Sequence, residues 1–201
     1  MNEREPRFSP ASPSAEQNEQ REKPSRLYHA SPFTRTKEVI TEFQPRPSRR
    51  DQAEGDVVFA ANDKAGATMF LVESDDSWTQ KSKFDDVYCE VIGDEQRWRE
   101  ADKGGRIYSL PGDNFSCDIS KGWGKCEWVN PNPVQPIQEE TEEYDSALKA
   151  MISHGVQVFM VDQDTFKQIR ESEDHGLAIL QKATSENQKL GEKVLPLEDK
   201  C

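Results

Sequence analysis

Short apolar runs separated by polar turns are the main pattern along most of the chain. Leu27 to Pro32 mixes apolar and polar residues and ends in a proline, and Val57 to Ala61 is continuously apolar. Runs of this length, bounded by glycine, aspartate or proline, are typical of β-strands. The same pattern predicts further strands at 86–92, 106–110, 114–120, 125–129 and 156–161.

A helical repeat of apolar residues is clearest in the last third of the chain. Tyr144, Leu148 and Met151 recur at helical spacing, which predicts a helix over 141–154 that ends at Gly155. Asn62-Asp63 offers an N-cap for another helix, predicted over 64–72. Shorter helices are predicted at 164–170 and 175–182, and polar loops at 44–54 and 74–83. A polar connection that contains Gly104-Gly105 is predicted between the strands at 86–92 and 106–110.

These elements predict an α+β fold. Strands dominate the middle of the chain and helices interrupt them irregularly, which favours mixed or antiparallel sheets over a regular βαβ series. A length of 201 residues suggests one domain with tails, and the domain is predicted at 26–187. Residues 1–25 and 188–201 are predicted to be disordered, because they hold too few apolar residues to offset chain entropy.

The composition narrows the classes of partner. The formal net charge is −12, and the basic cluster from Arg46 to Arg50 lies in a proline-rich stretch. Because phosphate neutralisation dominates nucleic-acid binding, this charge disfavours a DNA or RNA partner. No apolar run is long enough for a membrane helix and no signal peptide is visible, so a cytoplasmic protein without membrane contact is predicted. The four cysteines form no CxxC pair, and no metal site is predicted.

Three short segments carry the candidate chemistry. The first is Tyr28-His29-Ala30-Ser31, the second is the run 57–61 with the helix that leads to Phe70, and the third is Glu127-Trp128. Each has an ordinary structural explanation when it is taken alone. A strand glutamate usually faces solvent, and a single histidine is more often a hydrogen-bonded structural residue than a catalyst.

Taken in order, the three segments resemble the ADP-ribosyltransferase superfamily, in the branch that includes the poly(ADP-ribose) polymerases. Leu27-Tyr28-His29-Ala30-Ser31 is similar to the branch's Leu-aromatic-His-Gly-Ser strand. Residues 56–60 are similar to its Gly-x-Tyr-Phe-Ala strand, and Glu127-Trp128 to its late strand with a glutamate and an aromatic residue. The chain also resembles small bacterial and phage proteins that start with Tyr-His-Gly-Ser-Pro. The resemblance spans about 27–129 and implies the split mixed or antiparallel sheets of that superfamily.

The resemblance implies NAD as a substrate and ADP-ribose transfer to an unknown acceptor, either a protein or a small molecule. It makes Glu127 the catalytic carboxylate, because cleavage of the nicotinamide–ribose bond passes through an oxocarbenium-like state that negative charge stabilises. It also implies that His29 binds the ribose hydroxyls of adenosine.

The resemblance further implies a nicotinamide subsite. The backbone N–H and C=O of Ala30 would bind the nicotinamide amide, and the Ser31 hydroxyl would add a hydrogen bond. The aromatic residues available to stack on the ring are Phe59, Phe70 and Trp128.

The sequence also departs from the branch pattern. Val58 stands where the branch has its stacking tyrosine, and Met69 stands near the second stacking position. A non-catalytic module that binds NAD, ADP-ribose or a protein is therefore an alternative. An RNA 2′-phosphotransferase-like enzyme would share the fold, but few basic residues lie near the motifs to hold RNA phosphate. In the form that the resemblance implies, the enzyme hypothesis requires His29 and Glu127 to line one cleft.

Overall fold

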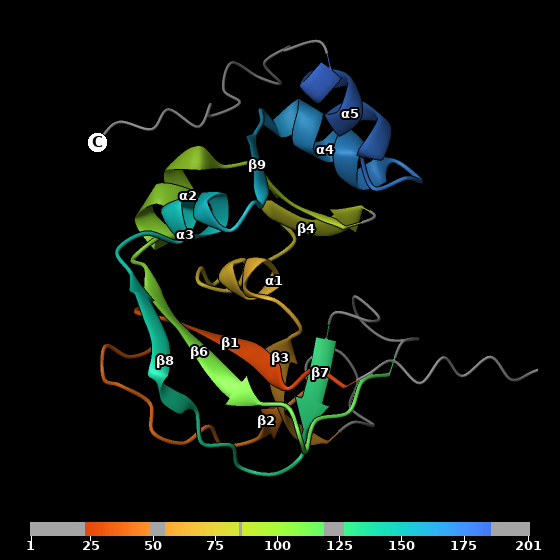
Figure 1. The fold of residues 1–201 in the computed structure, drawn as a ribbon. Coiled ribbons are helices and arrows are strands. Elements are labelled where there is room, and N and C mark those ends of the chain that lie inside the picture. Colours follow the sequence, from red (N-terminus) through yellow and green to blue (C-terminus); the bar gives the residue numbers. More distant parts are fainter. Residues whose placement is uncertain (1–22, 49–54, 85, 119–126, 186–201) are drawn as a thin grey trace, which may run out of the picture.

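We describe residues 23–48, 55–84, 86–118 and 127–185 of a computed structural model of the chain. Within them the fold is α+β, with a six-stranded antiparallel sheet and a three-stranded mixed sheet (Figure 1). The named strands and helices all lie between Arg26 and Ser185, inside the predicted domain. Among these residues, no helix combines the length and apolar character needed to cross a membrane.

The large sheet has the order β2-β3-β1-β6-β8, and β7 pairs with β3. All of its printed pairings are antiparallel. Its strands are β1 (Arg26–Pro32), β2 (Arg46–Pro47), β3 (Asp56–Ala61), β6 (Gly105–Pro111), β7 (Glu127–Asn130) and β8 (Ile137–Tyr144).

The small sheet has the order β4-β5-β9, in which β4 is antiparallel and β9 parallel to β5. Its strands are β4 (Thr79–Phe84), β5 (Val87–Ile92) and β9 (Gln157–Met160). The helices are α1 (Lys64–Thr68), α2 (Glu95–Ala101), α3 (Ala147–Ser153), α4 (Gln163–Glu171) and α5 (Leu177–Ser185). Figure 1 shows α1 between the two sheets and α4 and α5 beyond the small sheet.

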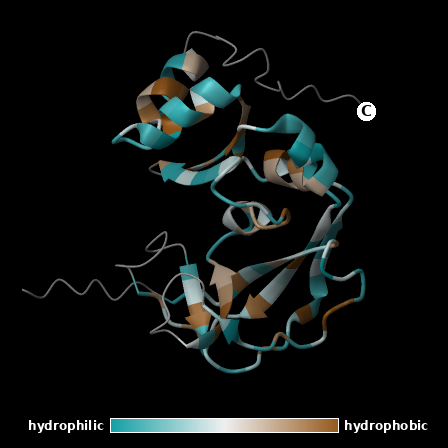
Figure 2. Cartoon of the chain, turned by 180° about the vertical axis from the view of Figure 1, so that it is seen from behind, coloured by the Kyte–Doolittle hydropathy of each residue, from teal (hydrophilic) through white to brown (hydrophobic). Residues whose placement is uncertain are grey.

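Three hydrophobic clusters hold these layers together. The first joins Ala61 and Ile107 of the large sheet to α1, α3 and the small sheet. The second lies on the opposite face of the large sheet and contains Leu27, Tyr108 and Trp128. The third joins the outer face of the small sheet to α4 and α5, and Figure 2 shows hydrophobic and hydrophilic residues mixed along both helices, as expected when one helix face is covered. We call the α1 side of the large sheet its helix-side face and the opposite side its loop-side face.

The apolar runs confirm most of the predicted strands. β1, β3, β5, β6 and β9 agree with the predictions to within a residue or two at each end. The helix predicted over 64–72 begins as expected at the N-cap Asp63, whose side chain accepts from the Gly66 N–H, but it ends at Thr68. Turns then follow, so that the chain buries both Leu71 and Val72, which a continued helix would point in different directions.

Three predictions from polar sequence are wrong. Residues 79–84 form strand β4 rather than a loop, because pairing with β5 satisfies their backbone groups. Helix α2 occupies a segment predicted as a connection, and it buries Trp98 to 1 % exposure. Residues 137–144 form strand β8, so the helix predicted from residue 141 begins at Ala147, after the N-cap Ser146.

Other predictions are tested only in part. Two residues of the predicted loop 44–54 form the short strand β2. Around Phe115, the described part of the strand predicted over 114–120 contributes one bridge, Ser116 to Val129. The predicted disordered tails lie almost entirely outside the described residues, as do residues 119–126.

Candidate functional site

The pairing around β3 determines where the predicted site residues lie. Ala61 of β3 pairs with Tyr28 of β1 on one side and with Glu127 of β7 on the other. Cross-strand partners project to the same face of a sheet, so all three side chains lie on the helix-side face. Two strand spacings separate the α carbons of Tyr28 and Glu127 by about 10 Å.

His29 projects to the other face. It follows Tyr28 directly along β1, and successive strand residues alternate between faces. Its ring centroid lies 4.4 Å from that of Phe43, which belongs to the loop-side cluster. The structure therefore places His29 and Glu127 on opposite faces of the large sheet. They do not line one cleft as the resemblance implies.

The imidazole of His29 instead links two separating strands. The register pairs β1 with β3 at Tyr28–Ala61, and the Nδ1 atom of His29 lies 2.6 Å from the Phe59 carbonyl oxygen. Because a carbonyl can only accept, Nδ1 donates this hydrogen bond. Burial, together with the charges of Arg35 and Arg46, lowers the pKa of His29 to about 4 against the opposing effect of this hydrogen bond. His29 is therefore a neutral structural residue near pH 7.

We expect NMR titration of the His29 ring to show no protonation between pH 8 and pH 5, with a midpoint at about 4. The folded-state pKa lies below the unfolded value, so protonation favours unfolding as the pH falls below 6.5. A His29 midpoint near 6.5 in the folded protein would show that its ring is solvated and free to bind a ligand.

The backbone groups of Ala30 face β3 at the point where the printed pairing of β1 with β3 ends. Phe33 N–H donates to Gly104 O at 3.0 Å, and Gly112 N–H donates to Ser25 O at 3.2 Å. Backbone bonding alternates along an antiparallel pair, so the odd-numbered residues of β1 bond to β6 and the even-numbered ones face β3. Within the described residues, the register pairs no residue of β3 with Ala30. The N–H and C=O of Ala30 therefore point toward β3 where the pairing ends; we call this place the opening between β1 and β3, and the His29 imidazole contacts the Phe59 carbonyl there.

The aromatic candidates are divided between faces. Phe59 pairs with Val129 two residues before the Ala61–Glu127 pair, so it lies on the helix-side face and is partly exposed. Trp128 lies on the loop-side face in the second cluster and is 8 % exposed. Phe70 follows α1 and is 44 % exposed, with its ring centroid 5.9 Å from Lys81 Nζ.

Ser31 is also turned away from the helix-side face. It alternates with Ala30 along β1 and is buried, with 6 % exposure. The structure thus brings Ala30, Phe59 and Glu127 to one face and separates them from His29, Ser31 and Trp128.

A cavity that the sequence did not reveal opens between β6 and β8 on the helix-side face. Ile107 pairs with Glu142 and Ser109 with Ile137, so four residues of β8 lie opposite Tyr108 alone. Such a bulge is common beside functional sites. The resulting cavity of about 250 Å³, which we call the β6–β8 cavity, is lined by Tyr28, Lys64, Ser109, Glu139, Glu140, Thr141 and Glu142. The available signal is the four glutamates among residues 139–143, but the apolar spacing assigns the second half of this segment to the helix predicted over 141–154.

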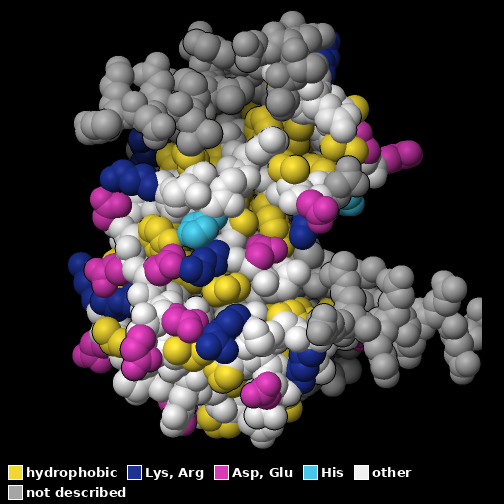
Figure 3. Space-filling model, in the orientation of Figure 1, with side chains coloured by type: hydrophobic (Ala, Val, Ile, Leu, Met, Phe, Trp, Pro, Cys, Tyr) yellow, Lys and Arg dark blue, Asp and Glu magenta, His cyan; other side chains and the backbone are white. Residues whose placement is uncertain are grey.

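A network of polar side chains continues from this cavity. Lys64 forms an ion pair with Glu142, and the Tyr144 hydroxyl donates to Glu142 and lies 2.7 Å from Nε2 of His154. Burial alone would raise the pKa of Glu142, but the hydrogen bonds from Lys64 and Tyr144 outweigh it and hold that pKa below its usual value. Glu142 is therefore ionised near pH 7. Figure 3 shows acidic and basic side chains interspersed over the surface of the large sheet.

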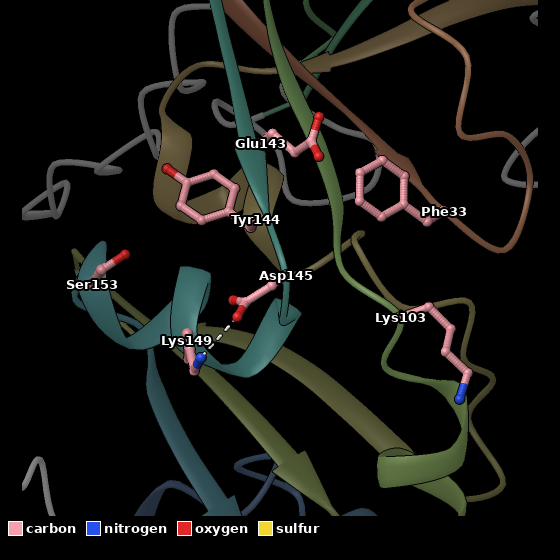
Figure 4. A pocket seen from close by; sticks show the side chains of 7 residues that line it. All are labelled: Phe33, Lys103, Glu143, Tyr144, Asp145, Lys149 and Ser153. Atoms are coloured by element: carbon pink, nitrogen blue, oxygen red, sulfur yellow. Dashed lines mark hydrogen bonds and ion pairs between the residues drawn. The ribbon is translucent and has the colours of Figure 1, made fainter.

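A wider depression lies at the end of β8 (Figure 4). Its volume is about 790 Å³, and it is lined by Phe33, Lys103, Glu143, Tyr144, Asp145, Lys149 and Ser153. Both acidic residues of its lining form ion pairs within the chain, Asp145 with Lys149 and Glu143 with Arg106. It brings together none of the predicted site residues.

The small sheet contains a buried ion pair that faces α1. Glu90 of β5 has no solvent exposure, and its Oε1 atom lies 3.4 Å from Nζ of Lys81 on β4. Neither carboxylate oxygen has a hydrogen-bond partner in the structure. Desolvation raises the pKa of Glu90 to about 7, although the charge of Lys81 opposes the change.

Comparison of the chain with protein-family models, with curated proteins and with solved structures found no match. Within the described residues, no group of three or more His, Cys, Asp or Glu side chains could hold a metal ion.

Proposed function

We propose that the chain binds NAD on the helix-side face of the large sheet, cleaves its nicotinamide–ribose bond, and transfers ADP-ribose to an unknown acceptor. The observation that supports this proposal is the opening between β1 and β3, which presents the Ala30 backbone beside the strand pair that carries Glu127. NAD is the substrate that the sequence motifs imply. Its nicotinamide amide requires hydrogen-bond partners such as the Ala30 backbone groups, and its ribose requires a nearby carboxylate such as Glu127.

The distance between the opening at Ala30 and the Glu127 carboxylate suits nicotinamide riboside. Phe59, level with the opening, and Ala61, paired with Glu127, are two residues apart on β3. Two residues along the strands and two strand spacings across the sheet separate the α carbons of Ala30 and Glu127 by about 12 Å. This matches a nicotinamide amide held at the opening with the attached ribose above Glu127. Phe59, on the same face, is the aromatic residue best placed to contact the ring.

The chemistry follows from these groups. The Ala30 N–H would donate to the amide oxygen of nicotinamide, and the Ala30 C=O would accept from its NH₂ group. The bond between C1′ and the nicotinamide nitrogen breaks, and nicotinamide leaves with the electron pair. The Glu127 carboxylate stabilises the positive charge that develops on the ribose. The acceptor then bonds to C1′ and loses a proton. This proposal departs from the resemblance, because His29 and Glu127 share no cleft: His29 supports the sheet and does not bind adenosine.

The proposal is tested by measuring nicotinamide release from NAD and, separately, NAD binding by calorimetry. We expect both with the full chain. Absence of NAD binding at millimolar concentration would overturn the proposal.

The orientation of His29 favours a second candidate, a module that binds NAD or ADP-ribose without turnover. A fold that retains the Ala30 opening but turns the histidine away keeps part of the binding site only. Binding of ADP-ribose with no nicotinamide release over hours would select this candidate.

Ala30→Pro tests the backbone contact directly. Proline removes the N–H that faces the opening, and the ladder with β6 stays intact because it uses the neighbouring residues. We expect at least tenfold weaker binding of NAD and of a nicotinamide analogue, since a lost hydrogen bond that leaves a polar partner unpaired costs about 1–3 kcal/mol. Calorimetry measures the affinity, and thermal unfolding checks the fold. Ala30→Gly, which keeps the N–H, is the matched control. Equal affinity in a folded Ala30→Pro protein would remove the backbone contact from the site.

A further inference from the structure

The β6–β8 cavity already holds a positive charge that the chain supplies itself. The Nζ atom of Lys64 lies 5.7 Å from the centroid of the Tyr28 ring, and the same ammonium pairs with Glu142. An ammonium at this distance from an aromatic face is attracted by the ring quadrupole. The ring and the carboxylate belong to different strands, so the tertiary fold builds this environment.

The lining favours a further cation over an anion. Glu139, Glu140 and Glu142 contribute three carboxylates, and Lys64 is the one basic residue among the lining side chains. Arg26 pairs with Glu140 from beside the cavity, with Nε 3.1 Å from Oε2. Even with this arginine included, the acids exceed the bases, and among the described residues Glu139 forms no ion pair.

The cavity also contains polar groups that a ligand could use. The Thr141 hydroxyl oxygen is buried without a hydrogen-bond partner. Ser109 is 2 % exposed, and its hydroxyl makes a long bond of 3.4 Å to the Glu140 carbonyl. Both hydroxyls can accept hydrogen bonds from an ammonium or guanidinium group.

We propose that the β6–β8 cavity binds the cationic group of a ligand, an ammonium or a guanidinium, between the Tyr28 ring and the Glu142 carboxylate, and that the Lys64 ammonium occupies this position in its absence. The Lys64 side chain is 30 % exposed. Its ammonium can therefore move into solvent on its flexible stem while α1 stays in place. The cavity lies over Tyr28, on the same face as Glu127. If the proposed function holds, the cation belongs to the acceptor, but binding itself requires no NAD.

The test is calorimetry on the full chain with three probes: N-acetyl-arginine amide, N-acetyl-lysine amide and the uncharged N-acetyl-citrulline amide. We expect the charged probes to bind and the citrulline probe to fail, and the tighter charged probe identifies the preferred group. Lys64→Met removes the competing ammonium and should tighten binding roughly fivefold, the equivalent of one partly exposed ion pair.

Two further variants make the proposal falsifiable even if Lys64→Met is unstable. Glu142→Gln and Tyr28→Leu each remove one side of the cation site and should weaken binding, whereas Tyr28→Phe keeps the ring and should not. Lys167→Met, which breaks an exposed pair with Glu171 on α4, is the matched control. Equal binding of the citrulline and arginine probes, or a folded Lys64→Met protein that binds no more tightly than wild type, would overturn the proposal. Because these measurements contain no NAD, their failure is distinguishable from failure of the proposed function.

Discussion

Glu127→Gln is expected to slow nicotinamide release from NAD by roughly 10²–10³-fold, the effect of removing one electrostatic contributor to a transition state. Glutamine keeps the volume of the side chain but cannot carry the negative charge that opposes the developing positive charge on the ribose. Because that charge appears in the transition state, the affinity for NAD should change far less than the rate. A nicotinamide-release assay and calorimetry measure the two quantities.

Glu171→Gln is the matched control for this experiment. Glu171 lies on α4 with its side chain 67 % exposed, so its substitution should change neither the rate nor the affinity. If Glu127→Gln released nicotinamide at the wild-type rate, the carboxylate would have no catalytic role. If the wild type bound NAD but released none, the binding-module alternative would hold.

The second large effect concerns stability, and it comes from the buried Glu90. The unfolded chain ionises this carboxyl near pH 4.5, while the folded protein does so near 7. Below the unfolded pKa both states are protonated and there is no penalty. Between about pH 4.5 and 7 the unfolded chain ionises Glu90 while the folded protein keeps it protonated, so stability falls, and above the folded pKa the loss is complete. The difference between the two pKa values corresponds to about 3 kcal/mol.

Glu90→Gln isolates this contribution. The free energy of unfolding of the wild type, measured relative to the variant, should decrease by about 3 kcal/mol between pH 4 and pH 8. Chemical denaturation at a series of pH values measures it. The comparison is needed because other carboxyls, including Asp162 and Asp174, have lowered pKa values and act in the opposite direction. A pH-independent difference between wild type and variant would show that Glu90 has the same pKa in the folded and unfolded states, with the effect of burial fully offset by Lys81.

Polar strands mark one limit of prediction from this sequence. The segment 79–84 contains two lysines, a serine and a glutamine, a composition typical of a loop. It forms a strand because β5 supplies backbone partners and Glu90 lies opposite Lys81. The sequence of residues 79–84 gives no sign of β5 or of Glu90, because both lie outside this segment. β8 is similar, since its glutamates suit a helix as well as an exposed strand, and pairing with β6 decides between the two.

The candidate site marks a second limit. The motif around His29 and the acid at Glu127 were both found from the sequence, and both lie on strands. The face to which a strand residue projects depends on register, and a shift of one residue reverses it. The pairing of Ala61 with Tyr28 and Glu127 puts His29 on the opposite face from Glu127, although the order of the motifs predicts that His29 and Glu127 lie together. The β6–β8 cavity depends on a bulge, which leaves no recognisable mark in composition.

Local sequence patterns were enough to predict the α+β class, the apolar strands β1, β3, β5, β6 and β9, and the residue types available for chemistry. They could do so because apolar periodicity and turn residues act over a few neighbouring positions. Only tertiary pairing determines which residues meet: Ala61 with Tyr28 and Glu127, His29 with Phe59, and Lys64 with Glu142. These contacts join residues 30 to 78 positions apart in the chain. Strand pairing and register, which no local pattern encodes, bring them together.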